Sequence, residues 1–353
     1  MNPAPGPIAI TQGDPAGIGG ELIAKLYAVD PALTAGCFVV GDAGHLRRAA
    51  AVVAGPGRAP LPVMAITDPG QALSAPAGCI PLFQVGQVTP PQSLVRWGQV
   101  QAQAGRLAAD AVTWAARAAL RRQVAAVVTA PLHKEALAAA GVDFPGHTEL
   151  LQAQAAAHLG RPVSEVPVRM MLASPALRTV LVSIHVSLRD AIEAVTRKNV
   201  LETLRITHAA LSAMLGRAPR IAVAGLNPHA GEGGLFGREE VETIAPAVAD
   251  ARAGGLDVHG PIAPDTVFMR ARSDGGPGEF DVVVAMYHDQ GLIPVKYLGL
   301  EQGVNVTLGL PLVRTSPDHG TAFDIAGSGR ADPSSLAQAV RTARSLRTLG
   351  AGH

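Results

Sequence analysis

Several residue types are scarce in this chain, and each scarcity excludes a class of protein. Only 16% of the 353 residues are charged, the net charge is +1, and just four of the 29 basic residues are Lys. A nucleic-acid-binding surface needs a broad basic patch, so we expect no nucleic-acid partner. The two cysteines, Cys37 and Cys79, are too few for a disulfide scaffold or a Cys-rich metal site, and they fit a reducing compartment.

Long apolar runs are also missing. No segment reaches the roughly 18–20 apolar residues of a membrane helix, because Gly, Pro or a charge interrupts each run. The first seven residues, Met-Asn-Pro-Ala-Pro-Gly-Pro, lack the basic stretch and following apolar segment of a targeting peptide. We therefore expect a cytoplasmic protein with no membrane partner.

What the chain has in abundance is apolar mass arranged in alternating patterns. Hydrophobic residues make up 48% of the sequence, and its length predicts about two domains. Short β-branched runs alternate with Ala/Leu-rich helical stretches, which predicts an α/β fold with a largely parallel sheet. The predicted strands are 7–11, 37–41, 63–67, 125–129, 168–172, 179–184, 221–225, 281–286 and 304–308. The predicted helices are 94–123 (one or two helices), 188–215, 238–252 and one capped by the Asp-Pro-Ser-Ser at 332–335, and residues 49–62 read as a loose surface connection.

Three histidines each lie just beyond the carboxyl end of a predicted strand: His185, His229 and His288. Ligands of open parallel sheets bind along that edge. Three imidazoles meeting there could hold a divalent metal ion and leave positions open for substrate. A lone His is more often a capping or core residue, so only the shared location makes a metal site plausible.

Two Gly-rich loops lead from a predicted strand into a helix. Residues 225–237 carry His229 together with an Asn and a Glu, and free N–H groups of such a loop can face an anion. The loop at 10–21 contains Gly-Asp-Pro-Ala-Gly and reads either as a tight turn or as a contact to substrate or cofactor. The 225–237 loop is not the G-x-G-x-x-G dinucleotide fingerprint, and no acidic residue at the standard offset marks a ribose site, so no cofactor-binding residue is assigned.

Further polar residues stand in apolar surroundings. Lys296, Asn305 and Arg314 need partners if they are buried, and these could be a phosphorylated or carboxylated substrate or internal salt bridges to Asp289 and Asp318. His147 and Thr148 precede a helix, where Thr148 taken alone reads as an N-cap.

Longer motifs in these segments carry a resemblance. They are the segments 129–135 (TAPLHKE), 146–149 (GHTE), 225–234 (GLNPHAGEGG), 263–266 (APDT), 286–291 (MYHDQG), 303–311 (GVNVTLGLP) and 314–322 (RTSPDHGTA). In these motifs the chain resembles the 4-hydroxythreonine-4-phosphate dehydrogenase family of vitamin B6 biosynthesis, from Ile10 to about Ala339. One departure is Val-Ser-Ile-His-Val-Ser-Leu at 182–188, where some members have a Thr-Thr-His-Leu-Pro-Leu type of segment.

The resemblance implies a fold like that of isocitrate and isopropylmalate dehydrogenases, with two α/β/α domains and the active site in the cleft between them. By this analogy we expect one domain from residues 1–125 and 275–353, and a second, dimer-forming domain from 126–274. Members are homodimers with shared active sites.

The resemblance also implies a reaction. Members oxidise the 3-hydroxyl of 4-phosphooxy-L-threonine with NAD or NADP, and the 3-oxo acid loses CO₂ to give 3-amino-2-oxopropyl phosphate. The family's metal-binding histidines match His185, His229 and His288, with one contributed by the partner subunit, and the ion is Zn, Mg or Co. Its substrate contacts match His147, Thr148, Lys296, Asn305 and Arg314. Lys296 and Asp289 are the candidates for the catalytic base.

The sequence leaves two alternative functions open. A related dehydrogenase could act on 4-phosphoerythronate, phosphothreonate or a cis-dihydrodiol, of which Lys296 and Arg314 favour the phosphorylated substrates. A phosphate-ligand-binding or phosphotransacetylase-like protein on a similar fold would not need three metal histidines.

Overall fold

The computed structural model describes residues 6–273, 276–299 and 303–347, and the chain divides into two compact units. Unit 1 is built from Met1–Pro167 and Leu310–His353, and unit 2 from Val168–Gly309. The expected domain boundary at 125/126 falls inside unit 1, between a helix and the strand that follows it, and the one at 274/275 lies outside the described residues. The strand at 126–129 belongs to unit 1 because it pairs with strands of that unit on both sides.

Unit 1 contains a parallel sheet whose strands lie in the order β3-β4-β2-β1-β5-β12. Their bounds are β1 (Ile8–Thr11), β2 (Cys37–Gly41), β3 (Val63–Ile66), β4 (Ile80–Gln84), β5 (Ala126–Thr129) and β12 (Arg314–Pro317). β1, β2 and β5 are buried throughout, which is why they read as continuous apolar runs rather than alternating ones.

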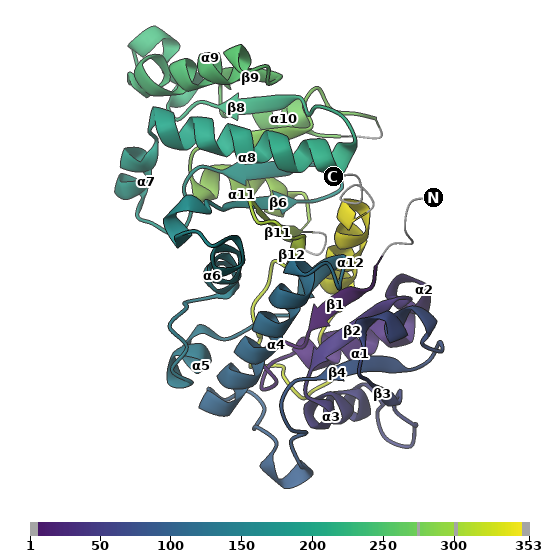
Figure 1. Cartoon of the computed structure of the whole chain (residues 1–353). Helices are drawn as coiled ribbons and strands as arrows, with labels where there is room; N and C mark the ends of the chain where they lie inside the picture. The colour runs from purple at the N-terminus through teal and green to yellow at the C-terminus, as the bar shows by residue number, and fades with distance from the viewer. Residues whose placement is uncertain (1–5, 274–275, 300–302, 348–353) are drawn as a thin grey trace. The chain divides into compact units, whose positions relative to one another are not determined.

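Helices pack on this sheet and on one another. They are α1 (Gly19–Val29), α2 (Pro31–Thr34), α3 (Ala43–Ala54), α4 (Ala102–Leu120), α5 (Lys134–Ala139), α6 (His147–Leu159) and α12 (Ser334–Arg347). The helix α12 lies against β5, β12 and α1, so segments far apart in the sequence pack together in unit 1 (Figure 1). The Ala-rich face of α4 lies over the sheet, where Trp114 stacks on Phe83 with ring centroids 4.1 Å apart. Both α5 and α6 pack on α4, and Gly105 of α4 has no room for a Cβ beside the Ala136 backbone.

Unit 2 contains a mixed sheet in the order β11-β6-β7-β10-β8-β9. Its strands are β6 (Arg169–Ala173), β7 (Arg178–Leu181), β8 (Ile221–Ala224), β9 (Val258–Ile262), β10 (Val282–Ala285) and β11 (Val304–Leu308). β7, β10, β8 and β9 run parallel, whereas β6 is antiparallel to both of its neighbours. The carboxyl ends of β7, β10 and β8 therefore share one edge of the sheet.

The helical segments of unit 2 are α7 (Leu188–Ala194), α8 (Arg197–Leu215), a 3₁₀ segment η4 (Pro228–Gly234), a π-helical segment η5 (Glu240–Ile244), α9 (Ala245–Ala253), α10 (Val267–Ala271) and α11 (His288–Tyr297). A core of Leu, Val and Ala side chains, including Leu172, Leu181 and Val283, holds α10 and α11 to the sheet. α8 ends where Gly216 adopts the left-handed conformation (φ 67°), a glycine stop as expected.

The α/β class is confirmed, but several elements differ from expectation. β4, β9 and β12 were not predicted, because Pro81, the Gly260–Pro261 pair and the polar Arg-Thr-Ser-Pro run hide them from a β-branched pattern. The predicted helix 94–123 is α4 alone, since Gly98 (φ 67°) keeps the preceding segment irregular. The predicted helix 188–215 is two helices, because Thr196 caps the second by accepting from the Asn199 N–H at 3.2 Å. Residues 49–54 of the expected loose connection are the last turns of α3.

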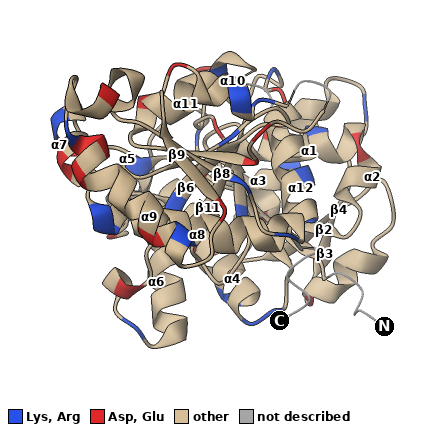
Figure 2. Ribbon diagram, turned by 90° about the horizontal axis from the view of Figure 1, so that it is seen from above, with Lys and Arg blue, Asp and Glu red and all other residues tan. Residues whose placement is uncertain are grey.

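Acidic and basic residues are interspersed along the chain, and α7 carries both signs (Figure 2). Among the described residues, no helix is both long enough and apolar enough to cross a membrane.

Candidate active site

Two of the predicted metal histidines lie together in unit 2. His185 follows β7 and His288 opens α11 directly after β10, and these two strands are parallel neighbours. Their imidazole rings have centroids 5.6 Å apart and planes inclined at 46°. The two strand ends are joined because the N–H and the hydroxyl of Ser183 both donate to the carbonyl of Met286, at 3.2 and 3.0 Å. Topology thus brings together two residues 103 positions apart, as the strand-end reasoning predicts.

Asp289 lies against His288. Its Oδ1 is 2.7 Å from Nδ1 of the imidazole, and its side chain is otherwise exposed. A carboxylate on one ring nitrogen fixes the tautomer and leaves the other nitrogen, Nε2, available to a metal ion. This contact gives Asp289 a means of orienting His288.

His229 occupies a strained loop. Five successive residues, from His229 to Gly233, have positive φ, with values of 53°, 53°, 76°, 43° and 69°. Three of them are not glycine, and each such residue costs about 1–3 kcal/mol unless the surroundings hold it in place. The imidazole is exposed and its nearest ring is Phe236, at 6.1 Å between centroids. Backbone strain of this size at an exposed His is typical of a functional loop.

The donor chemistry of the pair fits a divalent ion, but His229 does not join it within one chain. Imidazoles bind Zn²⁺ through bonds of about 2.0–2.1 Å, and two rings at the observed spacing can both reach one ion. Within residues 6–273, 276–299 and 303–347, no three His, Cys, Asp or Glu side chains are grouped so as to hold a metal. His185 and His288 could therefore supply two ligands, and no described residue, His229 included, completes a set of three with them.

Lys296 and Asn305 also belong to unit 2. Lys296 lies in the last turn of α11 and Asn305 is the second residue of β11, opposite Leu172 of β6. Both residues are partly buried. Lys296 thus shares a helix with His288 and Asp289.

Three other predicted substrate residues lie in unit 1, around the end of β5. Arg314 is buried at the start of β12, and its Nε and Nη2 donate to the hydroxyl of Thr129 at 3.1 and 2.8 Å. His147 is the first residue of α6 and Thr148 the second, so the N-cap position belongs to Gly146 and the expectation of a Thr148 cap is wrong. Helix α6 makes no side-chain cap bond, which leaves its first N–H groups able to receive an anion.

Burial is the main cause of the pKa shifts of His147 and Arg314. Burial lowers the pKa of His147 well below its usual value, the Arg314 charge lowers it further, and a hydrogen bond to the backbone of Ala130 opposes both. Its Nε2 is buried without a hydrogen-bond partner. Burial also lowers the pKa of Arg314 to about 10, and the Glu149 carboxylate acts in the opposite direction. Near neutral pH this group therefore pairs a neutral imidazole with a guanidinium that remains charged.

The Gly-Asp-Pro-Ala-Gly loop packs beside the same strand. A Cβ at Gly13 would meet the Pro131 carbonyl and one at Gly17 would lie 2.8 Å from the Thr321 carbonyl, so these glycines serve close packing. Asp14 in this loop is fully buried; Oδ1 accepts from the Ala16 N–H at 2.8 Å, and Oδ2 has no partner. Burial raises the pKa of Asp14 to about 6, against that hydrogen bond and the fields of His133 and His45.

Known proteins are similar to this chain along nearly its whole length. The family model of the pyridoxal phosphate biosynthetic protein PdxA matches residues 34–343. A 4-hydroxythreonine-4-phosphate dehydrogenase of Beijerinckia indica is 49% identical, covering 97% of this chain and 95% of the relative, and a D-threonate 4-phosphate dehydrogenase of Salmonella typhimurium is 45% identical, covering 96% and 98%. The crystal structure of a 4-hydroxythreonine-4-phosphate dehydrogenase from Klebsiella pneumoniae superposes with a TM-score of 0.84 at 42% identity, covering 97% of this chain and 99% of that one.

The chain belongs to the PdxA family. The family expected from the motifs is thereby confirmed, and this PdxA chain is a dehydrogenase of that family.

Sequence reasoning missed several polar residues that hold the PdxA loops in place. Glu240, at the start of η5, accepts from two backbone N–H groups of the His229 loop, and Gln290 links Met286 to Gly225. Thr129, which accepts from Arg314, was quoted only as part of a motif. The sequence contains Glu240 in a Glu-Glu pair after the Gly-rich loop and Gln290 in His-Asp-Gln-Gly. No sequence pattern predicts their roles, because both side chains bond to backbone atoms.

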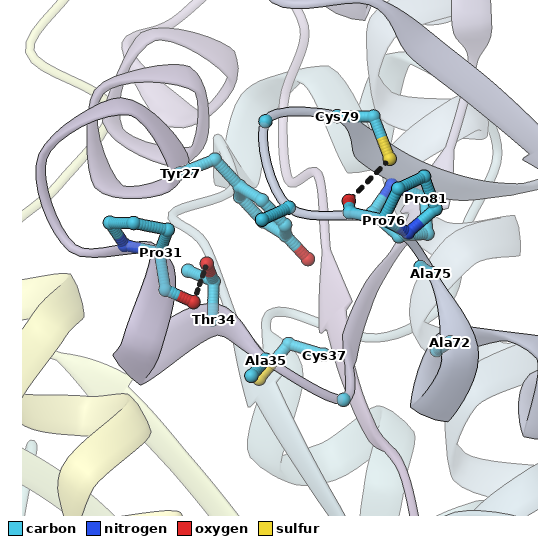
Figure 3. A pocket seen from close by; sticks show the side chains of 13 residues that line it. Tyr27, Pro31, Thr34, Ala35, Cys37, Ala72, Ala75, Pro76, Cys79 and Pro81 are labelled. Carbon is cyan, nitrogen blue, oxygen red and sulfur yellow. Dashed lines mark hydrogen bonds between the residues drawn. The ribbon is translucent and has the colours of Figure 1, made fainter.

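One pocket of this PdxA chain lies away from all of these residues. It has a volume of about 80 Å³ and is lined in part by Tyr27, Cys37 and Cys79, at the amino end of β2 in unit 1 (Figure 3). The Tyr27 hydroxyl points into it and is buried without a partner. Its walls are otherwise Pro, Ala, Gly and Thr, and it holds none of the predicted site residues.

Proposed function

We propose that this chain oxidises the 3-hydroxyl of 4-phosphooxy-L-threonine with NAD or NADP, in a reaction that depends on a divalent cation. The 3-oxo acid then loses CO₂, which gives 3-amino-2-oxopropyl phosphate and the reduced cofactor, a step of pyridoxine 5′-phosphate synthesis. The observation that carries the proposal is the His185–His288 pair, with ring centroids 5.6 Å apart. A phosphate-binding or phosphotransacetylase-like protein on a similar fold needs no such pair.

His185 and His288 would hold the cation, which is Zn²⁺, Mg²⁺ or Co²⁺. The Asp289 contact at Nδ1 of His288 supports binding through Nε2. His229 is the ligand that we assign to the partner subunit, because it lies apart from the pair within one chain. When bound, the cation supplies Lewis acidity that favours loss of the hydroxyl proton and draws electrons during decarboxylation, and NAD or NADP accepts the hydride.

The substrate phosphate would bind to the unit 1 group. Arg314 supplies a planar fork of N–H donors, and the first turn of α6, with His147 and Thr148, supplies further donors. Burial keeps His147 uncharged and its one ring N–H donates to the backbone of Ala130, so the unpartnered Nε2 would accept a hydrogen bond from a substrate hydroxyl or a protonated phosphate oxygen. Binding energy from this remote handle can orient C3 for reaction.

Lys296 and Asn305 would contact the carboxylate and hydroxyl end of the substrate. Lys296 is our choice for the base that takes the hydroxyl proton, since it lies on the same helix as His288. Asp289, the other candidate, is better placed to orient His288 than to accept that proton.

A homodimer with shared active sites follows from the same reasoning. Large apolar side chains are exposed close to each predicted metal ligand, which is typical of an interaction surface. They are Val186 and Leu188 beside His185, Leu235 and Phe236 after His229, and Ile293 and Tyr297 after His288. A second copy of the chain placed on these residues would cover them and bring His229 of the partner subunit to the pair.

A second candidate is oxidation of D-threonate 4-phosphate or 4-phosphoerythronate. The 45% identity to a D-threonate 4-phosphate dehydrogenase favours it almost as strongly. These substrates share the phosphate and the 3-hydroxyl, and they differ in carrying a hydroxyl where phosphothreonine has an amino group.

Reduction of NAD and NADP by the purified protein tests both candidates. The three phosphorylated substrates are assayed in parallel, with and without EDTA. We expect turnover of 4-phosphooxy-L-threonine that EDTA abolishes and added Zn²⁺, Mg²⁺ or Co²⁺ restores. Turnover of only D-threonate 4-phosphate or 4-phosphoerythronate would favour the second candidate function. Turnover at the full rate in EDTA would overturn the metal role.

A further inference from the structure

The His229 loop needs support from outside its own residues. The left-handed turn from His229 to Gly233 includes Ala230 and Glu232, which adopt φ values of 53° and 43°. Side chains with a Cβ leave this region unless neighbouring groups hold them there. Any residue that supplies this support also determines where the His229 imidazole points.

Glu240 supplies the support through a buried carboxylate. Its side chain is 2% exposed. Oε1 accepts from the N–H groups of Leu226 and Asn227, each at 2.7 Å, and Oε2 accepts from the Asn227 side-chain amide at 2.9 Å. All three donors lie at the beginning of the loop, within three residues of His229.

Packing brings the same carboxylate against the strained turn itself. A Cβ at Gly231 would lie 2.6 Å from Oε2 of Glu240, and one at Gly225 would lie 3.2 Å from Oε1. Glycine at both positions therefore lets the loop close around the carboxylate. Glu240 is also the first residue of the π-helical segment η5, a local departure from α-helix that is common at functional sites.

The loop is also connected to the element that carries His288. The Gln290 side chain accepts from the Met286 N–H and donates to the Gly225 carbonyl, both at 2.7 Å. The start of the His229 loop is thus held by Glu240 on one side and by α11 on the other.

We propose that Glu240 is a positioning residue that holds His229 in the orientation required for metal binding. The inference rests on the proposed metal role of His229. A carboxylate suits the position because it accepts all three hydrogen bonds and presents no donor of its own. A glutamine would place an amide N–H₂ against either the Asn227 amide or the backbone N–H groups.

The test measures Co²⁺ affinity of the metal-free, full-length protein by calorimetry, together with the visible spectrum of the Co²⁺ complex. Glu240→Gln should weaken Co²⁺ binding about 10- to 100-fold, the range seen when a group that orients a metal ligand is removed. The matched control is Glu242→Gln, two residues away on the same segment, whose exposed side chain accepts from Arg238. This control should bind Co²⁺ as the unmodified protein does.

A double-mutant cycle separates positioning from general damage. If Glu240 acts through His229, Glu240→Gln should cause no further loss of Co²⁺ affinity in a His229→Ala background. Equal losses in both backgrounds, or unchanged affinity and spectrum in the single variant, would overturn the proposal. If His229→Ala itself leaves affinity unchanged, the metal role under the proposed function fails instead.

A milder variant covers the case in which Glu240→Gln does not fold. Asn227→Ser keeps the backbone donors but removes the amide that bonds Oε2, so a smaller loss of Co²⁺ affinity is expected. Affinity equal to that of the Glu242→Gln control would overturn the proposal.

Discussion

Ionisation of Asp14 should cost this protein stability at neutral pH. The side chain is fully buried, and Oδ2 has no hydrogen-bond partner. Burial raises its pKa from 3.8 to about 6, because the Ala16 N–H and the distant histidines only partly compensate the lost hydration. The carboxyl group is therefore largely ionised at pH 7 in surroundings that disfavour the charge.

The magnitude and the sign follow from the two pKa values. A difference of about 2 pKa units corresponds to about 3 kcal/mol of free energy of unfolding. The folded state binds the proton more tightly, so this stability is present at low pH and is lost as pH rises through the folded pKa of about 6. Roughly 1.4 kcal/mol of it should disappear between pH 5 and pH 8.

Asp14→Asn removes the ionisation and keeps an oxygen that can accept from the Ala16 N–H. Urea unfolding followed by circular dichroism at pH 5, 6, 7 and 8 measures the effect. We expect the variant to be more stable than the unmodified protein at pH 8, with an advantage that shrinks by roughly 1.4 kcal/mol at pH 5. Asp324→Asn, at an exposed position of the same unit, is the control and should follow the unmodified protein. Parallel pH profiles for Asp14→Asn and the unmodified chain would refute the reasoning.

Three further predictions concern the site and its surroundings. Arg314→Lys keeps the charge but loses the planar fork, so KM for the phosphorylated substrate should rise roughly 10- to 100-fold with a smaller change in kcat; an unchanged KM in steady-state kinetics would contradict phosphate binding at Arg314. His229→Ala should abolish activity and weaken Co²⁺ binding while the protein still elutes from size-exclusion chromatography at the volume of the unmodified chain; full activity would contradict the assignment of His229 as a metal ligand. Tyr27→Phe should leave the free energy of unfolding unchanged or raise it by about 1 kcal/mol, since its buried hydroxyl has no partner, and a loss above 1 kcal/mol in urea unfolding would show that the hydroxyl has one.

The elements that could be predicted from the sequence are those whose burial leaves a pattern. β2 and β11 begin and end at the predicted residues, because β2 is a continuous run of small and apolar residues and β11 alternates apolar residues with Asn and Thr. β12 could not be found in this way: Arg-Thr-Ser-Pro is buried throughout, yet three of its four residues are polar and the fourth is Pro. Its place beside β5 depends on Thr129, which accepts from Arg314, and on the Ala339 carbonyl, which accepts from Thr315.

The candidate site likewise has one part that the sequence predicts and another part that it does not. Strand-end position was enough to predict that His185 and His288 would meet, because adjacent parallel strands end at one edge. The same reasoning brings His229, which follows β8, to that edge, but among the described residues it completes no set of three ligands with the pair. The backbone of its loop turns left-handed after Asn227, and this conformation depends on a carboxylate 13 residues further along the chain.

The residues that sequence rules describe least well are those we assign to chemistry. A buried Arg314 and the positive φ of His229 each contradict a local preference: for hydrated charge in the first case and for right-handed backbone in the second. Such conflicts persist only where the rest of the fold outweighs them, and they concentrate at functional sites. Each unit contains one such conflict together with a hydrogen-bonding neighbour. In unit 1, Thr129 accepts from the buried Arg314. In unit 2, Glu240 accepts from the loop that carries His229. If Glu240 and Thr129 are what make these costly arrangements tolerable, changing either should damage function before it damages the fold, because the strained loop or buried charge can relax locally.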